Sequence, residues 1–313
     1  MTKTMAGIRR AGTGLSVAAL MLVLSLLSGP AMAGDSDERL RIVATFSVIG
    51  DFVTEVAGDA AELHVLAPVG AEVHEYELRP RDFMALERAD VVFANGLDLE
   101  QWMPQVEATV QSGVPIVSLA EQSGIDTLPI VTGEYQGTPD PHLWMDPMAA
   151  AAYAEQIAAE LAELRPDHAE TFHANARAYQ ESLEALQAEM IETLSAIPER
   201  KRVLITSEAA FLYFGRAFDF HHDGIWGTNA ESEGTSSQIM RMLDIIAERG
   251  PRAVFWESTI SSRYVEGIAA DARVDVAGPL YVDSLGDERS GADSYIRMMR
   301  LNADTIRNAL ADD

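Results

Sequence analysis

Short apolar runs and amphipathic segments alternate along the first half of the chain. The runs at residues 41–46, 63–67, 91–94 and 114–119 have the length and residue types of buried strands. Helix-like segments follow or separate them, at residues 81–88 and 99–111. Because strands that alternate with helices usually pair in parallel, we expect a parallel sheet flanked by helices in this half.

The same alternation returns in the second half. Strands are predicted at residues 202–206, 253–256 and 276–282, and helices at residues 236–248 and 262–270. This half is therefore expected to form a second, mainly parallel sheet that is covered by its own helices.

A helical tract with little strand character, residues 147–196, lies between the two halves and is interrupted once. Asp146, followed by Pro147, is a typical helix start, and Asp167 is a candidate cap for the second helix of the tract. At roughly 1.5 Å per residue the second helix, residues 168–195, would be about 40 Å long. A helix of this length could join two lobes as a stiff backbone, and no flexible Gly/Ser linker is present.

The expected fold class is α/β, with two lobes that each contain a mainly parallel β-sheet flanked by helices and that are joined by one long rigid backbone helix. The expected organisation is a signal peptide at residues 1–33, an N-terminal α/β lobe at 34–166, a linking helix at 167–197 and a C-terminal α/β lobe at 198–313. The mature chain, about 280 residues, is long enough for two compact lobes.

The first 33 residues have the pattern of a secretory signal peptide. An apolar core at residues 15–27 follows the basic residues Lys3, Arg9 and Arg10. The segment Ala-Met-Ala at residues 31–33 has the small residues of a cleavage site. A membrane anchor is the alternative, but the apolar run is short for a hydrocarbon core of ~30 Å. We therefore expect cleavage and export.

Composition narrows the location and the partners. The sequence contains no cysteine, so it can form no disulfide and carry no lipid on an N-terminal cysteine. We expect a freely diffusing, monomeric periplasmic protein without a lipid anchor. With 23 basic against 49 acidic residues the net charge is −26, which excludes nucleic acid as a partner.

Two histidines and two acidic residues lie where α/β proteins place ligands, near the carboxyl ends of strands. His74 follows the predicted strand at 63–67, His142 precedes the helical tract, and Glu208 and Asp283 follow strands of the second half. Each residue alone is more often a surface or capping residue. Together, two imidazoles and two carboxylates supply the donors and the negative charge that suit a divalent transition metal ion.

Other polar residues have two interpretations each. His221 and His222 are adjacent, so on a strand they would point to opposite faces and at most one would face a cleft. Asp140 could orient His142 through a hydrogen bond, or simply form a turn. Glu257 ends a predicted strand and could face the same cleft.

Six segments of the mature chain carry a family resemblance: GAEVH at residues 70–74, ADVVFANGLDLE at 89–100, DPHLWMDP at 140–147, TSEAAF at 206–211, EGT at 233–235 and DSL at 283–285. On these motifs the chain resembles the metal-ion solute-binding proteins of ABC importers. That family contains manganese, iron and zinc receptors and the metal-binding adhesins. The resemblance covers the whole mature chain.

The resemblance implies two lobes joined by one rigid helix. It also implies that the first, third, fourth and last of these segments give one metal ligand each: His74, His142, Glu208 and Asp283, the same residues that their placement indicates. The ion is then a transported ligand, and the implied partners are an ABC importer permease and its ATPase.

Two departures from the zinc receptors of the family bear on the metal. Those receptors usually have histidine at the third ligand position and often a histidine-rich loop before the second, whereas this chain has Glu208 and no histidine at residues 133–139. A carboxylate in place of an imidazole favours Mn²⁺ and Fe²⁺ in relative terms, although Zn²⁺ still binds such ligands well. We expect Mn²⁺ first, then Fe²⁺, then Zn²⁺, with a zinc-specific receptor as the alternative.

Two other functional classes compete with a solute-binding protein. A metallohydrolase also uses histidines and carboxylates, but its metal keeps a position open for water or substrate. The sequence has no His-Glu-x-x-His and no Gly-x-Ser-x-Gly motif, so we expect no enzymatic activity. A surface adhesin is less favoured, because the sequence shows no repeat array and no lipid or wall anchor.

Overall fold

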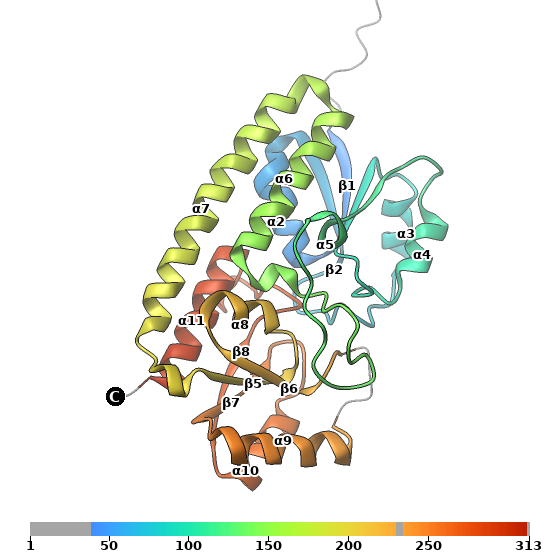
Figure 1. Cartoon of the computed structure of the whole chain (residues 1–313). Coiled ribbons are helices and arrows are strands. Elements are labelled where there is room, and N and C mark those ends of the chain that lie inside the picture. Colours follow the sequence, from blue (N-terminus) through green and yellow to red (C-terminus); the bar gives the residue numbers. More distant parts are fainter. Residues whose placement is uncertain (1–38, 230–233, 312–313) are drawn as a thin grey trace, which may run out of the picture. The chain divides into compact units, whose positions relative to one another are not determined.

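The computed structural model describes residues 39–229 and 234–311. The predicted signal peptide, residues 1–33, lies outside the described residues. Figure 1 shows the helices and strands, whose bounds in chain order are β1 (Leu40–Phe46), α2 (Ser47–Ala57), η2 (Gly58–Ala60), β2 (Ala61–Ala67), α3 (Pro80–Leu86), β3 (Val91–Ala94), α4 (Met103–Thr109), β4 (Ile116–Ser118), α5 (Leu119–Gln122), η3 (Leu143–Met145), α6 (Pro147–Leu164), η4 (Pro166–His168), α7 (Ala169–Ser195), η5 (Glu199–Lys201), β5 (Val203–Glu208), α8 (Leu212–Phe218), β6 (His221–Trp226), α9 (Ser236–Arg249), β7 (Ala253–Glu257), α10 (Arg263–Ala272), β8 (Asp275–Leu280) and α11 (Tyr295–Leu310).

The first sheet is entirely parallel, in the strand order β2-β1-β3-β4. Every residue of β3 and all but one of β1 are buried, as expected when helices cover both faces of a parallel sheet. α2 packs against β1 and β2. In Figure 1, α2 and α6 lie on one side of this sheet and α3 and α4 on the other. The expected parallel sheet flanked by helices is confirmed.

The second half contains two parallel pairs of strands, β5-β6 and β7-β8. β5 and β7 contact each other, and α9 and α10 pack over these strands through a separate apolar cluster. Parallel strands are therefore confirmed here too, although they form two short sheets and not one continuous sheet. The apolar pattern does not predict β6, because Asp223 and Gly224 interrupt its apolar run.

The helical tract forms two helices, α6 and α7, that pack against each other (Figure 1). Asp146 caps α6 as expected, since its side chain accepts a hydrogen bond from the Met148 backbone N–H. The expectation that Asp167 caps the next helix is wrong. α7 begins after His168 without a side-chain cap, and Asp167 pairs with Arg165 at 3.1 Å because both lie in the tight turn between the helices.

α7 has 27 residues, which corresponds to about 40 Å. One stripe of the helix is buried, and its members are three or four residues apart, which is the spacing of a single helical face. The stripe consists of Phe172, Ala176, Tyr179, Leu183, Leu186, Met190 and Leu194. α7 contacts α2 and α6 of the first half and α8 and α11 of the second. The long helix of the expected fold is confirmed, while the lobe boundaries at residues 166/167 and 197/198 stay predictions.

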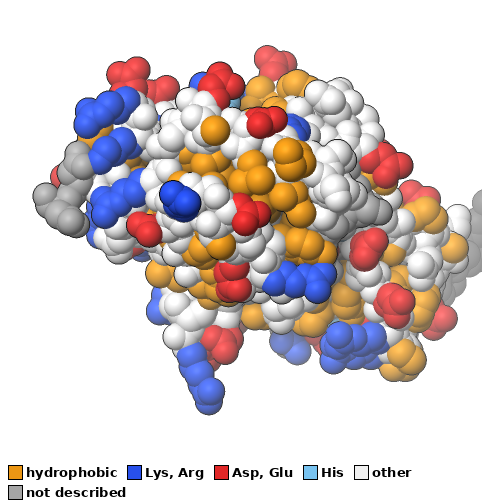
Figure 2. Space-filling model, turned by 90° about the horizontal axis from the view of Figure 1, so that it is seen from below, with side chains coloured by type: hydrophobic (Ala, Val, Ile, Leu, Met, Phe, Trp, Pro, Cys, Tyr) orange, Lys and Arg blue, Asp and Glu red, His pale blue; other side chains and the backbone are white. Residues whose placement is uncertain are grey.

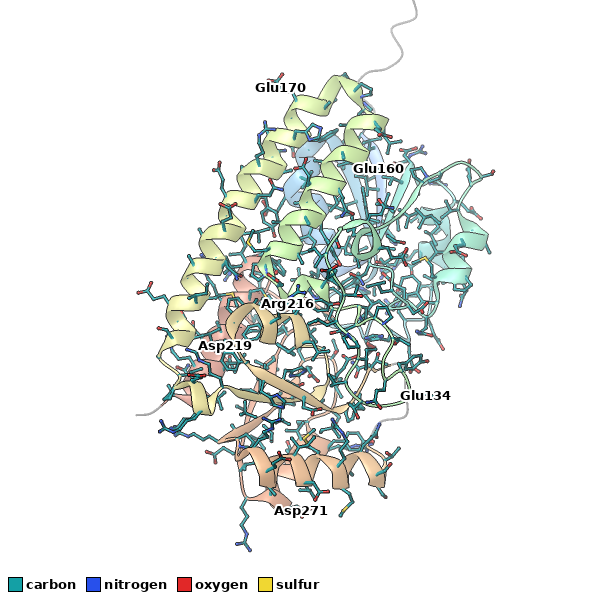
Figure 3. The ribbon with its side chains drawn as sticks, viewed as in Figure 1. Glu134, Glu160, Glu170, Arg216, Asp219 and Asp271 are labelled. Carbon is teal, nitrogen blue, oxygen red and sulfur yellow. The ribbon has the colours of Figure 1, made fainter. Side chains whose placement is uncertain are left out.

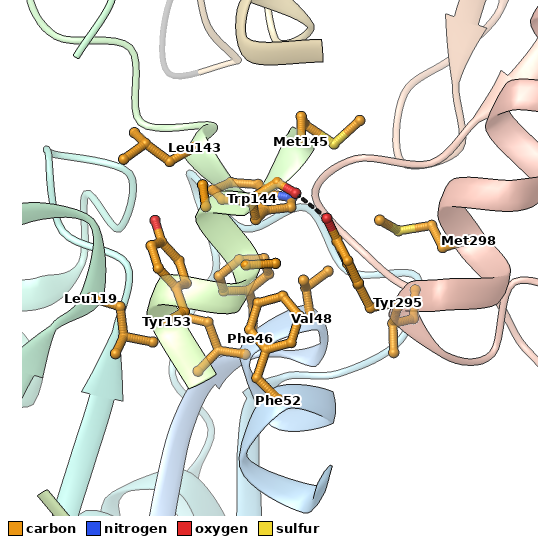
Figure 4. Packing of buried hydrophobic residues seen from close by; sticks show 14 of the residues in the cluster. Phe46, Val48, Phe52, Leu119, Leu143, Trp144, Met145, Tyr153, Tyr295 and Met298 are labelled. Atoms are coloured by element: carbon orange, nitrogen blue, oxygen red, sulfur yellow. Dashed lines mark hydrogen bonds between the residues drawn. The ribbon is translucent and has the colours of Figure 1, made fainter. Parts of the chain in front are cut away.

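The larger apolar core contains residues from both halves of the sequence. Figure 4 shows its centre, where Phe46 of the first half packs against Trp144 and Phe52 packs against Tyr295 of α11. The rings of Phe52 and Tyr295 are 4.9 Å apart, and the Tyr295 hydroxyl donates to the Trp144 carbonyl oxygen. Because the interior of a protein is closely packed, this shared core resists movement of one half against the other.

Polar contacts from α8 also join the two halves. The Tyr213 hydroxyl donates to the Asp140 carbonyl oxygen at 2.8 Å. Arg216, labelled in Figure 3, lies 3.6 Å from the Asp146 carboxylate and stacks over the Tyr213 ring. These contacts tie the second half to the loop that carries the DPHLWMDP motif.

Acidic and basic side chains are interspersed on the face shown in Figure 2, around apolar side chains near its centre. The net negative charge of the chain is therefore not gathered into one patch on this face. Among the residues that the structure describes, no helix combines the length and the hydrophobicity that crossing a membrane requires.

The buried face of α7 supports a stability prediction with a control in the same helix. Leu186 is fully buried, so Leu186→Ala should lower the free energy of unfolding by about 2–5 kcal/mol. Ile191 is 52 % exposed, so Ile191→Ala should change it by no more than about 0.5 kcal/mol. Urea unfolding measures both; equal losses would show that α7 does not pack through this face.

Candidate metal centre

Four side chains converge at one buried point: His74, His142, Glu208 and Asp283. Each is at most 1 % exposed, and one nitrogen or oxygen atom from each lies within 4.8 Å of the others. The Glu208 Oε1 atom is 3.2 Å from His74 Nε2 and 3.7 Å from His142 Nε2, and Asp283 Oδ1 is 3.6 Å from His142 Nε2. Four ligands at metal–ligand distances of about 2.1 Å in a tetrahedron would be roughly 3.4 Å apart.

His74 is held by the loop that follows β2. Its backbone N–H donates to the Glu72 carboxylate at 3.0 Å, and the preceding carbonyl, of Val73, accepts from the Trp102 indole N–H at 2.7 Å. The Thr228 hydroxyl lies 3.3 Å from His74 Nδ1. The loop is therefore fixed on both sides of the histidine, and the Nε2 atom faces the other three residues.

Asp140 positions His142. Its Oδ1 atom accepts from the backbone N–H of His142 at 3.1 Å and lies 2.6 Å from His142 Nδ1. Nδ1 therefore carries the hydrogen, which leaves the Nε2 lone pair facing the centre. Both interpretations of Asp140 hold, because the same carboxylate forms the turn and orients the imidazole.

Glu208 is the last residue of β5, and its neighbours are polar and buried. Its backbone N–H lies 3.3 Å from both carboxyl oxygens of Glu257, which ends β7. Its Oε1 atom accepts from the Asn229 backbone N–H at 2.8 Å. Burial and the charge of Glu208 raise the pKa of Glu257 well above its ordinary value, so Glu257 stays protonated.

Asp283 lies just beyond β8, between two fixed neighbours. The carbonyl oxygen of Val282 accepts from the Trp144 indole N–H at 3.1 Å. The Ser284 hydroxyl accepts from the Gly70 backbone N–H at 2.7 Å, which ties this segment to the loop that carries His74. The Asp283 Oδ2 atom accepts from Asn229 Nδ2 at 3.1 Å.

Each of the four side chains has one buried polar atom without a hydrogen-bond partner: His74 Nε2, His142 Nε2, Glu208 Oε2 and Asp283 Oδ1. Buried polar groups in proteins nearly always have partners, because an unpaired one is costly. Four side chains that converge at one point, each with a buried atom left unpaired, are the arrangement that a metal ion would complete.

The charges of the four side chains are strongly coupled. Burial lowers the pKa of His74, but the nearby Glu208 carboxylate outweighs burial and raises that pKa to about 10. Burial and the charge of Glu208 raise the pKa of Asp283 to about 8. Burial opposes the ionisation of Glu208, yet His142 and His74 hold its pKa at about 2. At neutral pH the site therefore retains protons that a cation would displace.

Among the described residues, no other group of three or more histidine, aspartate or glutamate side chains has this geometry. His221 and His222 lie on β6, the first exposed and the second buried. The ring of His222 bonds to the Phe211 N–H and the Leu204 carbonyl, so it is a core residue.

Thr228 and Asn229 contact three of the four side chains, yet sequence reasoning does not find them. They follow β6, a strand that the apolar pattern does not predict. Their position directly after a strand is the signal that could have found them, had β6 been recognised.

Comparison with known proteins supports a metal-binding receptor along most of the chain. The family described as "Zinc-uptake complex component A periplasmic" matches residues 42–309. The manganese-binding lipoprotein MntA of Halalkalibacterium halodurans is 39% identical over 298 residues, 93% of this chain and 97% of that protein. The iron-binding protein YfeA of Yersinia pestis is 37% identical over 299 residues, 93% of this chain and 95% of that protein.

A solved structure adds a likeness in three dimensions. The periplasmic zinc-binding protein TroA of Treponema pallidum superposes with a TM-score of 0.81 at 29% identity, covering 88% of this chain and all of that one. Fold, sequence and family thus agree. The chain belongs to the family of the zinc-uptake component, the metal-ion solute-binding proteins of ABC importers, whose members are binding receptors and not enzymes.

Proposed function

We propose that this protein captures one divalent transition metal ion with His74, His142, Glu208 and Asp283 and delivers it to an ABC permease that works with an ATPase. The observation that carries the proposal is the set of four unpaired, buried donor atoms, one from each of these side chains. The family supports the role of a receptor, and the geometry supports the choice of residues.

Burial and charge favour capture over catalysis. The four side chains are at most 1 % exposed, so a bound ion would be enclosed by protein. A catalytic metal needs an open position for water or substrate, which an enclosed set of four ligands does not offer. The two carboxylates match the charge of a divalent ion once the protons on the site have left.

We place Mn²⁺ first, Fe²⁺ second and Zn²⁺ third as the transported ion. Two of the four ligands are carboxylates, which favours Mn²⁺ and Fe²⁺ in relative terms. Relatives named as manganese-binding and iron-binding are 39% and 37% identical to this chain. A zinc-specific receptor is the second candidate, because the similar TroA structure is that of a zinc-binding protein.

We also propose that the mature protein faces the outside of the cytoplasmic membrane as a monomer in the periplasm, without a lipid anchor. The manganese-binding relative is named a lipoprotein, whereas this sequence has no cysteine to which a lipid could be attached. In this proposal the protein is first exported, then captures an ion, and only then docks on the permease.

Metal binding should stabilise the folded chain. A metal-free sample titrated with Mn²⁺, Fe²⁺ or Zn²⁺ should gain about 2.7 kcal/mol of stability at 100 times the Kd, seen as a higher melting temperature. Asp283→Asn removes one ligand charge and should abolish most of this gain. Glu288→Gln, at an exposed carboxylate nearby, should keep it. An unchanged response in Asp283→Asn would remove Asp283 from the site.

Metal binding should also release protons. The raised pKa values of His74 and Asp283, about 10 and about 8, mean that both groups hold protons at neutral pH in the metal-free protein. Because an ion must displace these protons, the apparent affinity should fall as the pH decreases from about 8 to about 6. Calorimetry in buffers of different ionisation enthalpy counts the protons; none released near pH 7 would contradict this description of the site.

A further inference from the structure

Asn229 contacts both carboxylates of the metal site. Its backbone N–H donates to Glu208 Oε1 at 2.8 Å, and its side-chain Nδ2 donates to Asp283 Oδ2 at 3.1 Å. The residue is only 4 % exposed, so water competes little for these bonds. Building on the metal-binding function proposed above, we propose that Asn229 sets the ion selectivity of the site by holding Asp283 to a single coordinating oxygen.

The orientation of the Asn229 amide is fixed by Trp226. The indole N–H can only donate, and it donates to Asn229 Oδ1 at 2.8 Å. The amide nitrogen therefore faces Asp283. Trp226 is fully buried and its ring lies 5.5 Å from that of Tyr264, which anchors the amide to the core of the second half.

The two oxygens of Asp283 are consequently unlike each other. Oδ1 has no hydrogen-bond partner and lies 3.6 Å from His142 Nε2. Oδ2 is held by Asn229. Because Asn229 occupies one lone pair of Oδ2 and holds that oxygen in place, binding an ion through both oxygens is disfavoured: Oδ2 would have to turn its remaining lone pair to the ion or give up the amide N–H, which would leave a buried donor unpaired.

This restriction affects the candidate ions unequally. Zn²⁺ is satisfied by four ligands in a tetrahedron, whereas Mn²⁺ prefers a larger set rich in oxygen. Withholding the second oxygen of Asp283 therefore weakens Mn²⁺ binding more than Zn²⁺ binding. Asn229 therefore acts against the relative preference for Mn²⁺ that the Glu208 carboxylate introduces, and raises the ratio of the Mn²⁺ Kd to the Zn²⁺ Kd.

The test compares Mn²⁺ and Zn²⁺ affinities, measured by competition with a chelator, in the wild type and in Asn229→Leu and Asn229→Ala. Leu keeps the side-chain volume and Ala does not, so a variant that retains its melting temperature can be chosen. Either change frees Asp283 Oδ2. The ratio of the Mn²⁺ Kd to the Zn²⁺ Kd should fall by about tenfold, the lower end of what partners of metal ligands contribute.

Thr228→Val is the matched control. It removes a hydroxyl from the same segment, 3.3 Å from His74 Nδ1, but an imidazole offers a metal one nitrogen whatever its neighbours are. Its effect on the two affinities should therefore be equal, and the ratio should not change.

A crystal structure of the Mn²⁺-loaded wild type tests the same proposal without any substitution. Asp283 should bind the ion through Oδ1 alone, with Asn229 Nδ2 still on Oδ2. Two coordinating oxygens from Asp283, or equal losses of both affinities in the Asn229 variants, would overturn the proposal. A wild type that bound neither ion would instead contradict the proposed function.

Discussion

The candidate metal centre depends on burying two imidazoles and two carboxylates close together while each side chain is held in one orientation. Ionisable groups are expensive to bury unless their atoms are paired. Here Asp140, Thr228 and Asn229 contact one atom of each side chain, and another buried atom of each has no hydrogen-bond partner. The hydrogen bonds around the site thus aim four donor atoms at the position where a divalent ion would satisfy them together.

The fold keeps that point in place because the two halves share a core. Phe46 and Phe52 of the first half pack with Trp144 and Tyr295, so the halves cannot separate without breaking apolar contacts. The Trp144 indole also bonds to the residue before Asp283. The shared core therefore resists movement of one half against the other when an ion is bound or released.

Much of the fold and of the candidate site could be predicted from the sequence. The physical reasons for this success also explain which residues could not be predicted. The strands β1 and β3 are short, mostly apolar runs, and α7 has a regular buried stripe, so these elements follow from the pattern of apolar residues. The four candidate ligands stand out because they flank predicted strands or helices and match the motifs of a family; they are His74, His142, Glu208 and Asp283. Asn229 could not be found in the same way, because it acts through hydrogen bonds that only the folded chain creates and follows a strand interrupted by Asp223 and Gly224.

The central claim is that the four side chains share one ion, and anomalous X-ray diffraction at the manganese edge tests it most directly. Crystals grown with Mn²⁺ should show one strong peak per chain, about 2.0–2.3 Å from a donor atom of each of His74, His142, Glu208 and Asp283. A peak elsewhere on the chain, or no peak at this point in crystals saturated with the ion, would contradict the account.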